Sequence, residues 1–599
     1  MKTMIIAIVN APCLRRCLLL TALLFVLQPL PGHADVRITG HVTDLNGAPL
    51  SQAMVTLTRP PDQPGASAVT VFTDADGGFS FPDAPPAGAA APVVAGRALG
   101  YEQVEASARG GQVNSLEFNI VMRPAANLAA VAPSSAWLAA MPVESRAKLM
   151  VTCAGCHQLP SPEVRAYANS IADQHVADPG DARVQSWRAI AKYMNLIWNQ
   201  EITRGSAGAT PGHTQHAYSV GDVDGVAAIL SDNFTGPMRE LPRYQYGATL
   251  AVTPRTQIRE YEIPRPNAIR EALLLGDPPR LWVADVSTDR IIAVDMATGA
   301  RKEYPIPAQV DFGPHTLHPG PDRSLWVAPF VNGVVAHLDM QKEEWRVWQL
   351  RNAAGAPAGI HDLSFGPDHQ LLTDRKGRIW FSDIVNNAVG YFHPDTSEVR
   401  TFDAPDVAGR PRDNAQLYGL AMTPDRKYVW YTQHGIGAFG CFNVETQKFE
   451  TLVTLPLADA GPRRITMGAD DVLYVPLYGA GQLLAYDTRK RRQIGVYDLP
   501  DRGSAPYAVT WDPVRKVVWI PTSNADVIYR FNPADGTFGV IPLPRQRAFL
   551  RMIDVDPKTG VLVTSYANIV QYGHGPRMAL LVDPGDSAYQ GKAVAQNDR

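Results

Sequence analysis

The sequence predicts a multidomain, mainly β protein that consists of a β-sandwich, a small all-α domain and a seven-bladed β-propeller. Three observations lead to this prediction. Alternating strand patterns broken by Asn-Gly and Asp-Gly turns occupy residues 35–123, helical periodicity surrounds the pentapeptide CAGCH at residues 153–157, and one strand-turn-strand pattern recurs seven times within residues 256–585. A chain of 599 residues is long enough to bury several separate cores.

The first 34 residues have the pattern of a secretory signal peptide. Arg15 and Arg16 precede the apolar run CLLLTALLFVL, and Gly32 to Ala34 provide the small residues of a cleavage site. An uncleaved anchor is the alternative. The residues that would flank Arg15 and Arg16 in a twin-arginine signal are missing, which favours the general export route. We therefore expect a periplasmic or secreted protein of bacterial type, with no transmembrane segment after cleavage.

Cysteine content and charge exclude several classes of protein. Cleavage of the signal removes two of the five cysteines and leaves Cys153, Cys156 and Cys441, which is too few for a disulfide framework. The net charge of −3 and the 19% of charged residues indicate neither a basic face for nucleic acid nor an acidic tail. We expect no nucleic-acid partner.

The N-terminal segment reads as β-hairpins of a small sandwich. GHVTDLNGAPLSQAMVTLT and TDADGGFSFPDAP alternate polar and apolar residues around their turns. The segment resembles the carboxypeptidase regulatory-like family, through residues Gly40, Asp44, Gly47, Pro49, Ala53 and Val55 of the first hairpin and Asp74, Asp76, Gly77 and Phe79 of the second. That resemblance implies a module without chemistry, and the acidic loop favours a turn over a calcium site. Residues 124–143, rich in Ala and Pro, are expected to be a linker.

The pentapeptide CAGCH predicts a covalent haem. In an exported protein, two cysteines three apart followed by histidine are the attachment signature of c-type haem: Cys153 and Cys156 form the thioethers and His157 ligates the iron. A redox disulfide and half of a zinc site are the alternatives, and the zinc site would need a second Cys/His pair. Residues 144–236 resemble the cytochrome c family, which implies one haem c and a periplasmic redox partner.

The second axial ligand is less determined by the sequence. VQSWRAIAKYMNLIWN places an apolar stripe on one helical face, made of Val184, Trp187, Ala191, Met194 and Trp198. We expect this stripe to cover the haem and Met194 to bind the iron, because a thioether suits an electron-transfer haem. Core packing is the other interpretation of Met194. The remaining candidates for the ligand are His175, His213, His216 and Met238.

The C-terminal half repeats a blade-like unit. Large apolar residues recur every 43 to 54 positions, at Trp282, Trp326, Trp380, Trp430, Tyr474, Trp519 and Leu562. The strand REYEIP precedes the first copy and is expected to close the ring by pairing with the seventh. Residues 586–599 are expected to be a tail. Residues 256–585 resemble the virginiamycin B lyase (streptogramin lyase) family of seven-bladed propellers, most closely in GPHTLHPGPDRSLWVAPFVNGVVAHLD and GIHDLSFGPDHQLLTDRKGRIWFSDIVNNAVGYFHPDT.

Each copy is expected to direct one polar side chain into the central channel. The aligned positions, which are our candidate catalytic residues, are Arg270, His315, His361, Tyr418, Arg463, Tyr507 and Arg551. The positive charge of the three arginines among them favours an anionic or carbonyl-bearing small molecule as the ligand. Solvated, ion-paired arginines and structural histidines are the alternative interpretation.

The lyase resemblance implies elimination, with a histidine as base and a divalent metal on the carbonyl. His315 and His361 match the family's histidine, whereas its acidic residue has only the shortened counterparts Asp285 and Asp383. Elimination also uses no electrons, which leaves a haem without a role. We therefore predict an electron-transfer haem protein whose propeller binds, and with a further organic cofactor or metal could oxidise, its ligand. A lyase with an accessory cytochrome and a non-enzymatic binding propeller are the alternatives.

Overall fold

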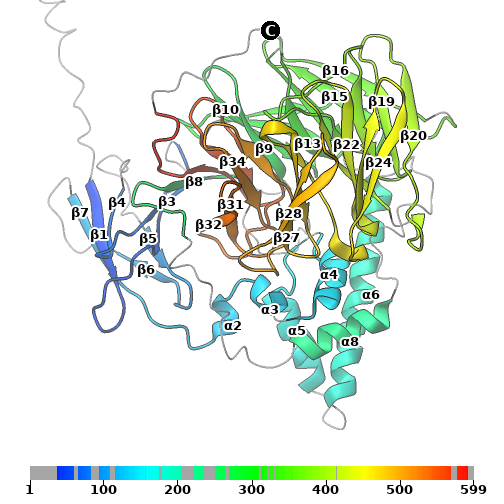
Figure 1. Cartoon of the computed structure of the whole chain (residues 1–599). Coiled ribbons are helices and arrows are strands. Elements are labelled where there is room, and N and C mark those ends of the chain that lie inside the picture. The colour runs from blue at the N-terminus through cyan, green and yellow to red at the C-terminus, as the bar shows by residue number, and fades with distance from the viewer. Residues whose placement is uncertain are drawn as a thin grey trace, which may run out of the picture.

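The structure is a computed structural model. It describes residues 37–59, 65–81, 93–107, 115–139, 141–155, 157–173, 179–205, 222–234, 250–263, 269–308, 312–321, 323–329, 332–352, 354–412, 415–567 and 577–590. The predicted signal peptide and most of the predicted tail lie outside these residues. The described part is mainly β, and the predicted β-propeller is confirmed (Figure 1).

The N-terminal segment forms two sheets that share a core. One sheet has the order β4 (Gly78–Phe81), β1 (Arg37–Thr43), β7 (Ser115–Val121), with β1 and β7 parallel. The other contains β3 (Ala68–Phe72), β2 (Met54–Thr58), β5 (Val93–Arg97) and β6 (Val104–Ala106). Ile38, Val55 and Phe118 from the two sheets pack in one buried cluster. Alternating burial along β1 explains why the period-2 pattern predicted these strands.

The acidic loop at residues 73–78 is a turn, as predicted. One carboxylate oxygen of Asp74 accepts hydrogen bonds from the backbone N–H groups of Asp76, at 3.0 Å, and Gly78, at 2.7 Å. Gly77 has a φ of 74°, which a residue with a side chain rarely adopts. The Asp74 carboxylate therefore stabilises the turn itself.

Seven four-stranded antiparallel units make up the propeller. Six are separate sheets, and the seventh is part of a larger sheet. In order, their strands are β9 (Ile269–Leu275), β10 (Arg280–Asp285), β11 (Arg290–Val294) and β12 (Arg301–Pro305); β13 (Pro314–Pro319), β14 (Ser324–Pro329), β15 (Val334–Asp339) and β16 (Glu344–Gln349); β17 (Ile360–Leu363), β18 (Ile379–Asp383), β19 (Ala388–Phe392) and β20 (Val399–Asp403); β21 (Leu417–Met422), β22 (Tyr428–Gln433), β23 (Ala438–Asn443) and β24 (Lys448–Thr454); β25 (Thr466–Met467), β26 (Val472–Leu477), β27 (Gln482–Asp487) and β28 (Arg492–Asp498); β29 (Thr510–Asp512), β30 (Val517–Pro521), β31 (Val527–Asn532) and β32 (Thr537–Pro542); β33 (Ile553–Val555), β34 (Leu562–Ser565), β35 (Met578–Asp583) and β8 (Gln257–Glu262).

The first strands of these units contact one another in a circle. β9 contacts β13, each later first strand contacts the next, and β33 contacts β9 again. The large repeated residues, Trp282 to Leu562, all lie on second strands and are buried. Trp282, for example, packs in a cluster with Phe312 and Leu317 of the next unit. The repeat in the sequence is therefore the apolar filling between adjacent sheets.

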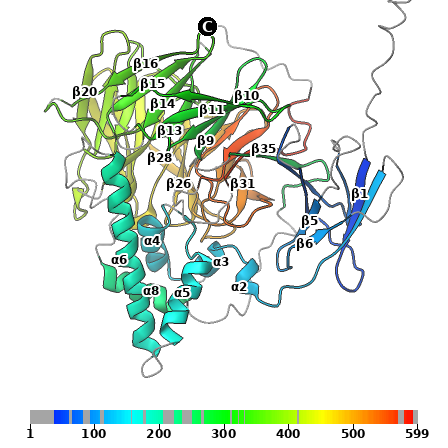
Figure 2. The ribbon, with the colours of Figure 1, turned by 180° about the vertical axis from the view of Figure 1, so that it is seen from behind.

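The predicted closing strand does close the seventh unit, and it has a second partner. β8 pairs antiparallel with β35 on one edge, with Glu262 opposite Met578. Its other edge pairs with β3 of the N-terminal sandwich, with Glu260 opposite Ala68. The result is one eight-stranded sheet that runs from the propeller into the sandwich. Figures 1 and 2 show the sandwich beside this edge of the propeller.

The helices gather at one end of the propeller (Figure 2). They are α2 (Leu128–Val131), α3 (Ser135–Ala139), α4 (Val143–Cys153), α5 (Pro162–Asp173), α6 (Pro179–Gly205) and α8 (Val223–Phe234). Lys148 on α4 pairs with Asp222 at 2.8 Å, and Arg188 on α6 pairs with Asp224 at 2.6 Å, so both helices are tied to the start of α8. Short 3-10 helices, including η3 (Ala458–Ala460), lie in propeller loops, and α4 packs on η3.

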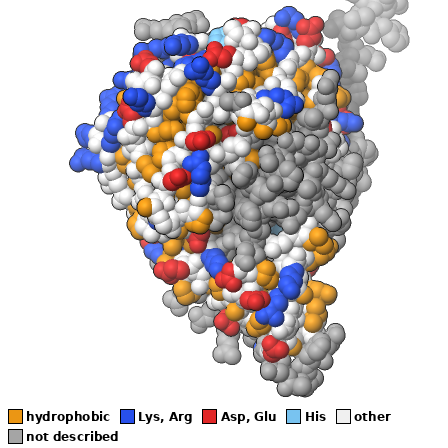
Figure 3. Space-filling model, turned by 90° about the vertical axis from the view of Figure 1, so that its right-hand side faces the viewer, with side chains coloured by type: hydrophobic (Ala, Val, Ile, Leu, Met, Phe, Trp, Pro, Cys, Tyr) orange, Lys and Arg blue, Asp and Glu red, His pale blue; other side chains and the backbone are white. Residues whose placement is uncertain are grey.

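One buried cluster joins the helices to the propeller. It contains Leu149 and Ala154 beside α4, Trp187 of α6 and Phe234 of α8, together with propeller side chains such as Tyr478. On the face seen in Figure 3, positive and negative side chains are interspersed. Within the described residues, none of the helices is long and apolar enough to cross a membrane.

Candidate functional site

The structure brings the seven predicted channel residues together. Arg270, His315, His361 and Tyr418 lie on the first strands of their units, and Arg463, Tyr507 and Arg551 lie just before theirs. All seven side chains are buried, with relative exposures of at most 3%. We call these seven residues the axial cluster. Residues at equivalent positions of successive blades converge on the axis, which explains how positions so far apart in sequence meet.

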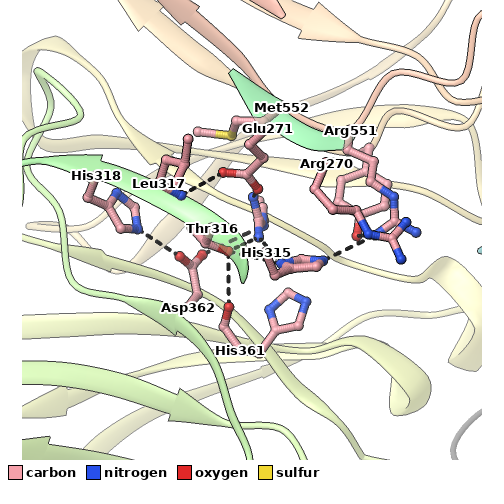
Figure 4. A network of polar contacts seen from close by, with 12 residues as sticks. Arg270, Glu271, His315, Thr316, Leu317, His318, His361, Asp362, Arg551 and Met552 are labelled. Atoms are coloured by element: carbon pink, nitrogen blue, oxygen red, sulfur yellow. Dashed lines mark hydrogen bonds and ion pairs between the residues drawn. The ribbon is translucent and has the colours of Figure 1, made fainter. Parts of the chain in front are cut away.

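Rings and guanidinium groups of the axial cluster stack around the axis. The ring centroids of His315 and His361 are 4.8 Å apart, and those of His361 and Tyr418 are 3.9 Å apart. The Arg463 guanidinium lies 5.2 Å from the ring centroid of Tyr418 and 4.5 Å from that of Tyr507. Figure 4 shows His315, His361, Arg270 and Arg551 in this arrangement.

A second layer of charged residues, which the sequence analysis missed, supports the cluster. Arg464 forms a buried ion pair with Glu271, and its Nε lies 3.8 Å from Asp362 Oδ2. Asp362 Oδ1 is also 3.1 Å from Nε2 of His318. Burial opposes the charge of Arg464, but the two carboxylates outweigh it and raise the pKa of the guanidinium. Glu271, Asp362 and Arg464 each follow an axial residue directly in the sequence, which is the signal that could have found them.

His315 is held by hydrogen bonds as a neutral imidazole. Its Nδ1 is 3.0 Å from the Thr316 hydroxyl oxygen, and this hydroxyl donates to the His361 carbonyl oxygen at 3.1 Å. Nη2 of Arg464 lies 3.1 Å from the same Nδ1 and donates to the Thr316 hydroxyl oxygen. Nε2 lies 3.2 Å from Nη1 of Arg551, which donates to it. Burial first, then His361 and the nearby arginines, hold the pKa of His315 well below its ordinary value.

His361 has a different environment. Neither of its ring nitrogens has a hydrogen-bond partner among the described residues, although the side chain is fully buried. Burial, followed by the positive charges of Arg464 and Arg551, holds the pKa of His361 well below its ordinary value. The ring is thus neutral, with a lone pair available, and is the axial group best suited to accept a proton or a hydrogen bond from a ligand.

Two tyrosines and Arg551 form a short hydrogen-bonded chain. Arg551 Nη1 donates to the Tyr507 hydroxyl at 2.9 Å, and the hydroxyl groups of Tyr507 and Tyr418 share a short hydrogen bond. Burial opposes ionisation of Tyr507, but Arg551, Arg463 and Arg464 outweigh this effect and lower its pKa below the usual range. The cluster therefore stabilises negative charge at this position.

The predicted haem-attachment segment lies directly against the axial cluster. Arg551 Nη2 donates to the Gly155 carbonyl oxygen at 2.6 Å, and the Tyr478 hydroxyl donates to the Ala154 carbonyl oxygen. Gln158 Nε2 donates to Asp526 Oδ1 at 2.8 Å, so the residue after His157 is also held by the propeller. No local pattern in the sequence indicates this contact between the helical segment and the propeller.

The residues of the attachment segment that the structure describes fit a c-type haem. Cys153 ends α4 and is half-buried against the cluster that contains Trp187 and Tyr478. His157 Nδ1 is 2.7 Å from the Gln158 carbonyl oxygen, so the proton sits on Nδ1 and the Nε2 lone pair remains for iron. Cys156 lies outside the described residues.

The candidates for the second axial ligand are only partly described. On α6, Trp187 and Ala191 are buried and Met194 is half-buried. Met194 lies roughly 10 Å further along the helix than Trp187, given a rise of about 1.5 Å per residue. Its role as a ligand stays a prediction. The side chain of Trp198, and residues His175, His213, His216 and Met238, lie outside the described residues.

The donor set does not fit the divalent metal that a lyase of the virginiamycin type would need. Asp285 accepts hydrogen bonds from Ser287 and Thr288, and Asp383 accepts from the backbone N–H of Gly359, so both carboxylates stabilise turns. The two ring nitrogens of His315 face the guanidinium groups of Arg464 and Arg551, whose positive charge would repel a cation. In the part of the chain that the structure describes, no three His, Cys, Asp or Glu side chains form a metal-binding group.

One family model matches the N-terminal sandwich. Residues 37–123 match the family model of the carboxypeptidase regulatory-like domain. No curated protein matches this chain. Among solved structures, selenomethionine-substituted virginiamycin B lyase from Staphylococcus aureus is similar with 18% identity and a TM-score of 0.44, over 54% of this chain and 98% of that one.

Two further solved structures are similar over the same share of this chain. A streptogramin B lyase structure has 18% identity and a TM-score of 0.44, with 97% of its own chain covered. The structure of U3-55K has 9% identity and a TM-score of 0.42, with 98% of its chain covered. The function of the axial cluster is therefore argued from its own residues.

Proposed function

We propose that this chain is an exported c-type haem protein in which a closed seven-bladed propeller holds a small anionic or carbonyl-bearing ligand next to the haem. The observation that carries the proposal is the contact of Arg551 with three groups. One guanidinium donates to Gly155 of the attachment motif, to His315 and to Tyr507. The haem-bearing segment and the predicted ligand-binding residues are thus joined by a single side chain.

The charge of the cluster supports an anionic ligand. The described contacts of the buried Arg551 are to neutral groups, and Arg463 lies over the rings of three tyrosines. A buried cation is stabilised most by an anion that approaches with hydrogen-bonding geometry, and guanidinium groups match carboxylates in this way. A carbonyl oxygen that gains negative charge during a reaction would be stabilised by the same donors.

Three axial residues and the attachment motif have roles in this proposal. Arg551 and Arg463 would orient the ligand, and His361 would accept a proton from it through a free ring nitrogen. Cys153, Cys156 and His157 would hold the haem, which would supply a one-electron acceptor between the ligand and a periplasmic redox partner. Oxidation of the ligand by two electrons would require a further organic cofactor or metal. Elimination is not favoured, because the donor set does not fit its metal.

The experiment combines a haem assay with an anion titration. The exported protein should stain for haem on a denaturing gel, and small carboxylates should shift its visible spectrum or its reduction potential saturably. In Arg551→Gln this response should weaken by tenfold or more, because a charge-assisted hydrogen bond contributes about 1.5–3 kcal/mol. Arg489→Gln, on an exposed side chain, is the matched control.

Three results would contradict the proposal. The first is the absence of covalent haem, and the second is an equal carboxylate response in Arg551→Gln and wild type. The third comes from the double variant His315→Gln with His361→Gln: if it folds, keeps its haem spectrum and still shows full ligand-dependent haem reduction, the chemistry lies elsewhere. Metal and cofactor analysis of the same protein would identify any further redox group.

A further inference from the structure

A cavity of about 500 Å³ lies where the sandwich, the linker and the propeller meet. The sandwich contributes residues such as Met54 and Arg97, the linker helix α2 contributes Ala130 and Val131, and the propeller contributes Asp526. In Figure 1 this is the region where β5 and β6, α2 and β32 come together. A volume of this size at a domain junction is typical of a small-molecule site.

The cavity has an ionic floor. Asp526 is 5% exposed, and its Oδ2 lies 3.5 Å from Nη2 of Arg97. Arg97 Nη1 donates to the Leu543 carbonyl oxygen at 2.9 Å. The Arg97 side chain is 15% exposed, so its guanidinium can be reached from the cavity.

At the bottom of the cavity, the groups still able to form hydrogen bonds are N–H donors. Asp526 Oδ1 already accepts from Gln158 Nε2 and from the Ala548 N–H, both at 2.8 Å, and Oδ2 faces Arg97. The contacts described for Arg97 use Nη1 and Nη2 once each, whereas a guanidinium has five N–H donors. An acceptor group, best an anion, therefore fits beside Arg97.

The walls and rim define the rest of the ligand. The walls include the half-buried apolar side chains of Leu99, Val131 and Leu250. The rim includes the exposed polar residues Ser51, Gln103 and Gln546. Apolar surface between a buried cation and a polar rim suits a molecule with an apolar body and one charged end.

We propose that this cavity is a second ligand site, separate from the axial cluster, and that it binds a small amphipathic anion whose headgroup contacts Arg97. The site does not depend on the haem or on the function proposed for the axial cluster. We expect a small headgroup with two acceptor oxygens, such as a carboxylate. The Arg97 guanidinium already uses part of its N–H donors within the protein, so the remaining donors suit one such group better than a large polyanion.

The probe for this site is anilinonaphthalene sulfonate, which has an apolar body and one anionic group. The full-length protein should bind one equivalent with a rise in fluorescence. Octanoate should displace it, whereas octanol, which has the same tail without the charge, should do so at least tenfold less well. This comparison separates anion recognition from nonspecific apolar binding.

Two variants with matched controls test the location. Arg97→Gln should weaken probe binding about tenfold or more, whereas Arg123→Gln, on an exposed sandwich residue, should not change it. Ala130→Trp adds a large side chain at an exposed lining residue and should block binding, whereas Ala126→Trp, also exposed, should not.

Ala130→Trp keeps the test decisive even if Arg97→Gln does not fold, because it leaves the Arg97–Asp526 pair intact. Unchanged probe binding in a folded Ala130→Trp protein would overturn the proposal. Equal displacement by octanoate and octanol would overturn the anionic character of the ligand. Neither result would bear on the axial cluster, whose anion response is measured separately through the haem.

Discussion

Arg551, just before the last propeller unit, donates a hydrogen bond of 2.6 Å to the backbone carbonyl of Gly155 inside the CAGCH motif. The two residues are 396 positions apart in the sequence. Because the same guanidinium contacts His315 and Tyr507, one side chain joins the motif to the axial cluster.

The haem assignment predicts that the two motif cysteines behave differently from the third cysteine. The double variant Cys153→Ala, Cys156→Ala should abolish haem staining on a denaturing gel, because only a thioether survives denaturation. Cys441→Ala is the control, since Cys441 is buried in β23 within the propeller. Persistent staining in the Cys153→Ala, Cys156→Ala double variant would refute the assignment.

Met194 is predicted to be the second iron ligand. The oxidised protein should then show the weak near-infrared band of sulfur bound to ferric haem, and Met194→Ala should lose it. Met150, which is buried within α4, gives the control variant Met150→Leu. A wild-type spectrum without this band would favour a histidine ligand from the candidate set.

Buried His361 predicts a loss of stability in acid. Its pKa is held well below the ordinary value in the folded protein, first by burial and then by Arg464, whereas in the unfolded chain it is near 6.5. Below that pH the unfolded chain binds a proton that the folded chain does not, so the free energy of unfolding falls as the pH falls. In His361→Gln the fall should be less steep, by about 1.4 kcal/mol per pH unit.

Urea unfolding between about pH 7 and pH 5 measures this difference, a range that brackets the ordinary histidine pKa. Leu45→Gln, on an exposed side chain of the sandwich, is the control and should keep the wild-type slope. Identical slopes for His361→Gln and wild type would show that His361 binds protons equally in the folded and unfolded chains, against its buried position beside the arginines.

Tyr507 is predicted to ionise before other tyrosines. Burial opposes its ionisation, but Arg551, Arg463 and Arg464 lower its pKa below the usual value near 10. An ultraviolet titration should therefore show one early tyrosinate, which Tyr507→Phe should lose and Arg551→Gln should shift to higher pH. Tyr193→Phe, on an exposed side chain of α6, should leave the early step intact.

The sequence predicted those parts of the fold whose residues recur at regular spacing along the chain. Trp380 and its counterparts marked the second strands because each must fill the space between two sheets, and REYEIP was recognisable as an additional outer strand. The seven axial positions followed from the same alignment. Glu271 and Arg464 were missed, since one residue's shift along a strand turns a side chain to another face and the alignment considered a single face.

The contacts between domains could not be predicted in this way. Neither the pairing of β3 with β8 nor the hydrogen bond from Arg551 to Gly155 has a local signature. Each depends on two surfaces that are complementary only after both parts have folded. Asp526 is a further example, because it contacts Arg97 of the sandwich and Gln158 of the motif segment at once.

The double pairing of β8 has a consequence for the order of folding. Glu262 pairs with Met578, so the ring cannot close until residue 578 has been synthesised. Contacts between residues so far apart in the sequence form slowly. Until they form, the unpaired edge of the strand can pair with another chain and cause aggregation. β3 precedes β8 in the chain and covers its other edge. β3 of the sandwich can therefore pair with one edge of β8 before β35 is available to pair with the other edge.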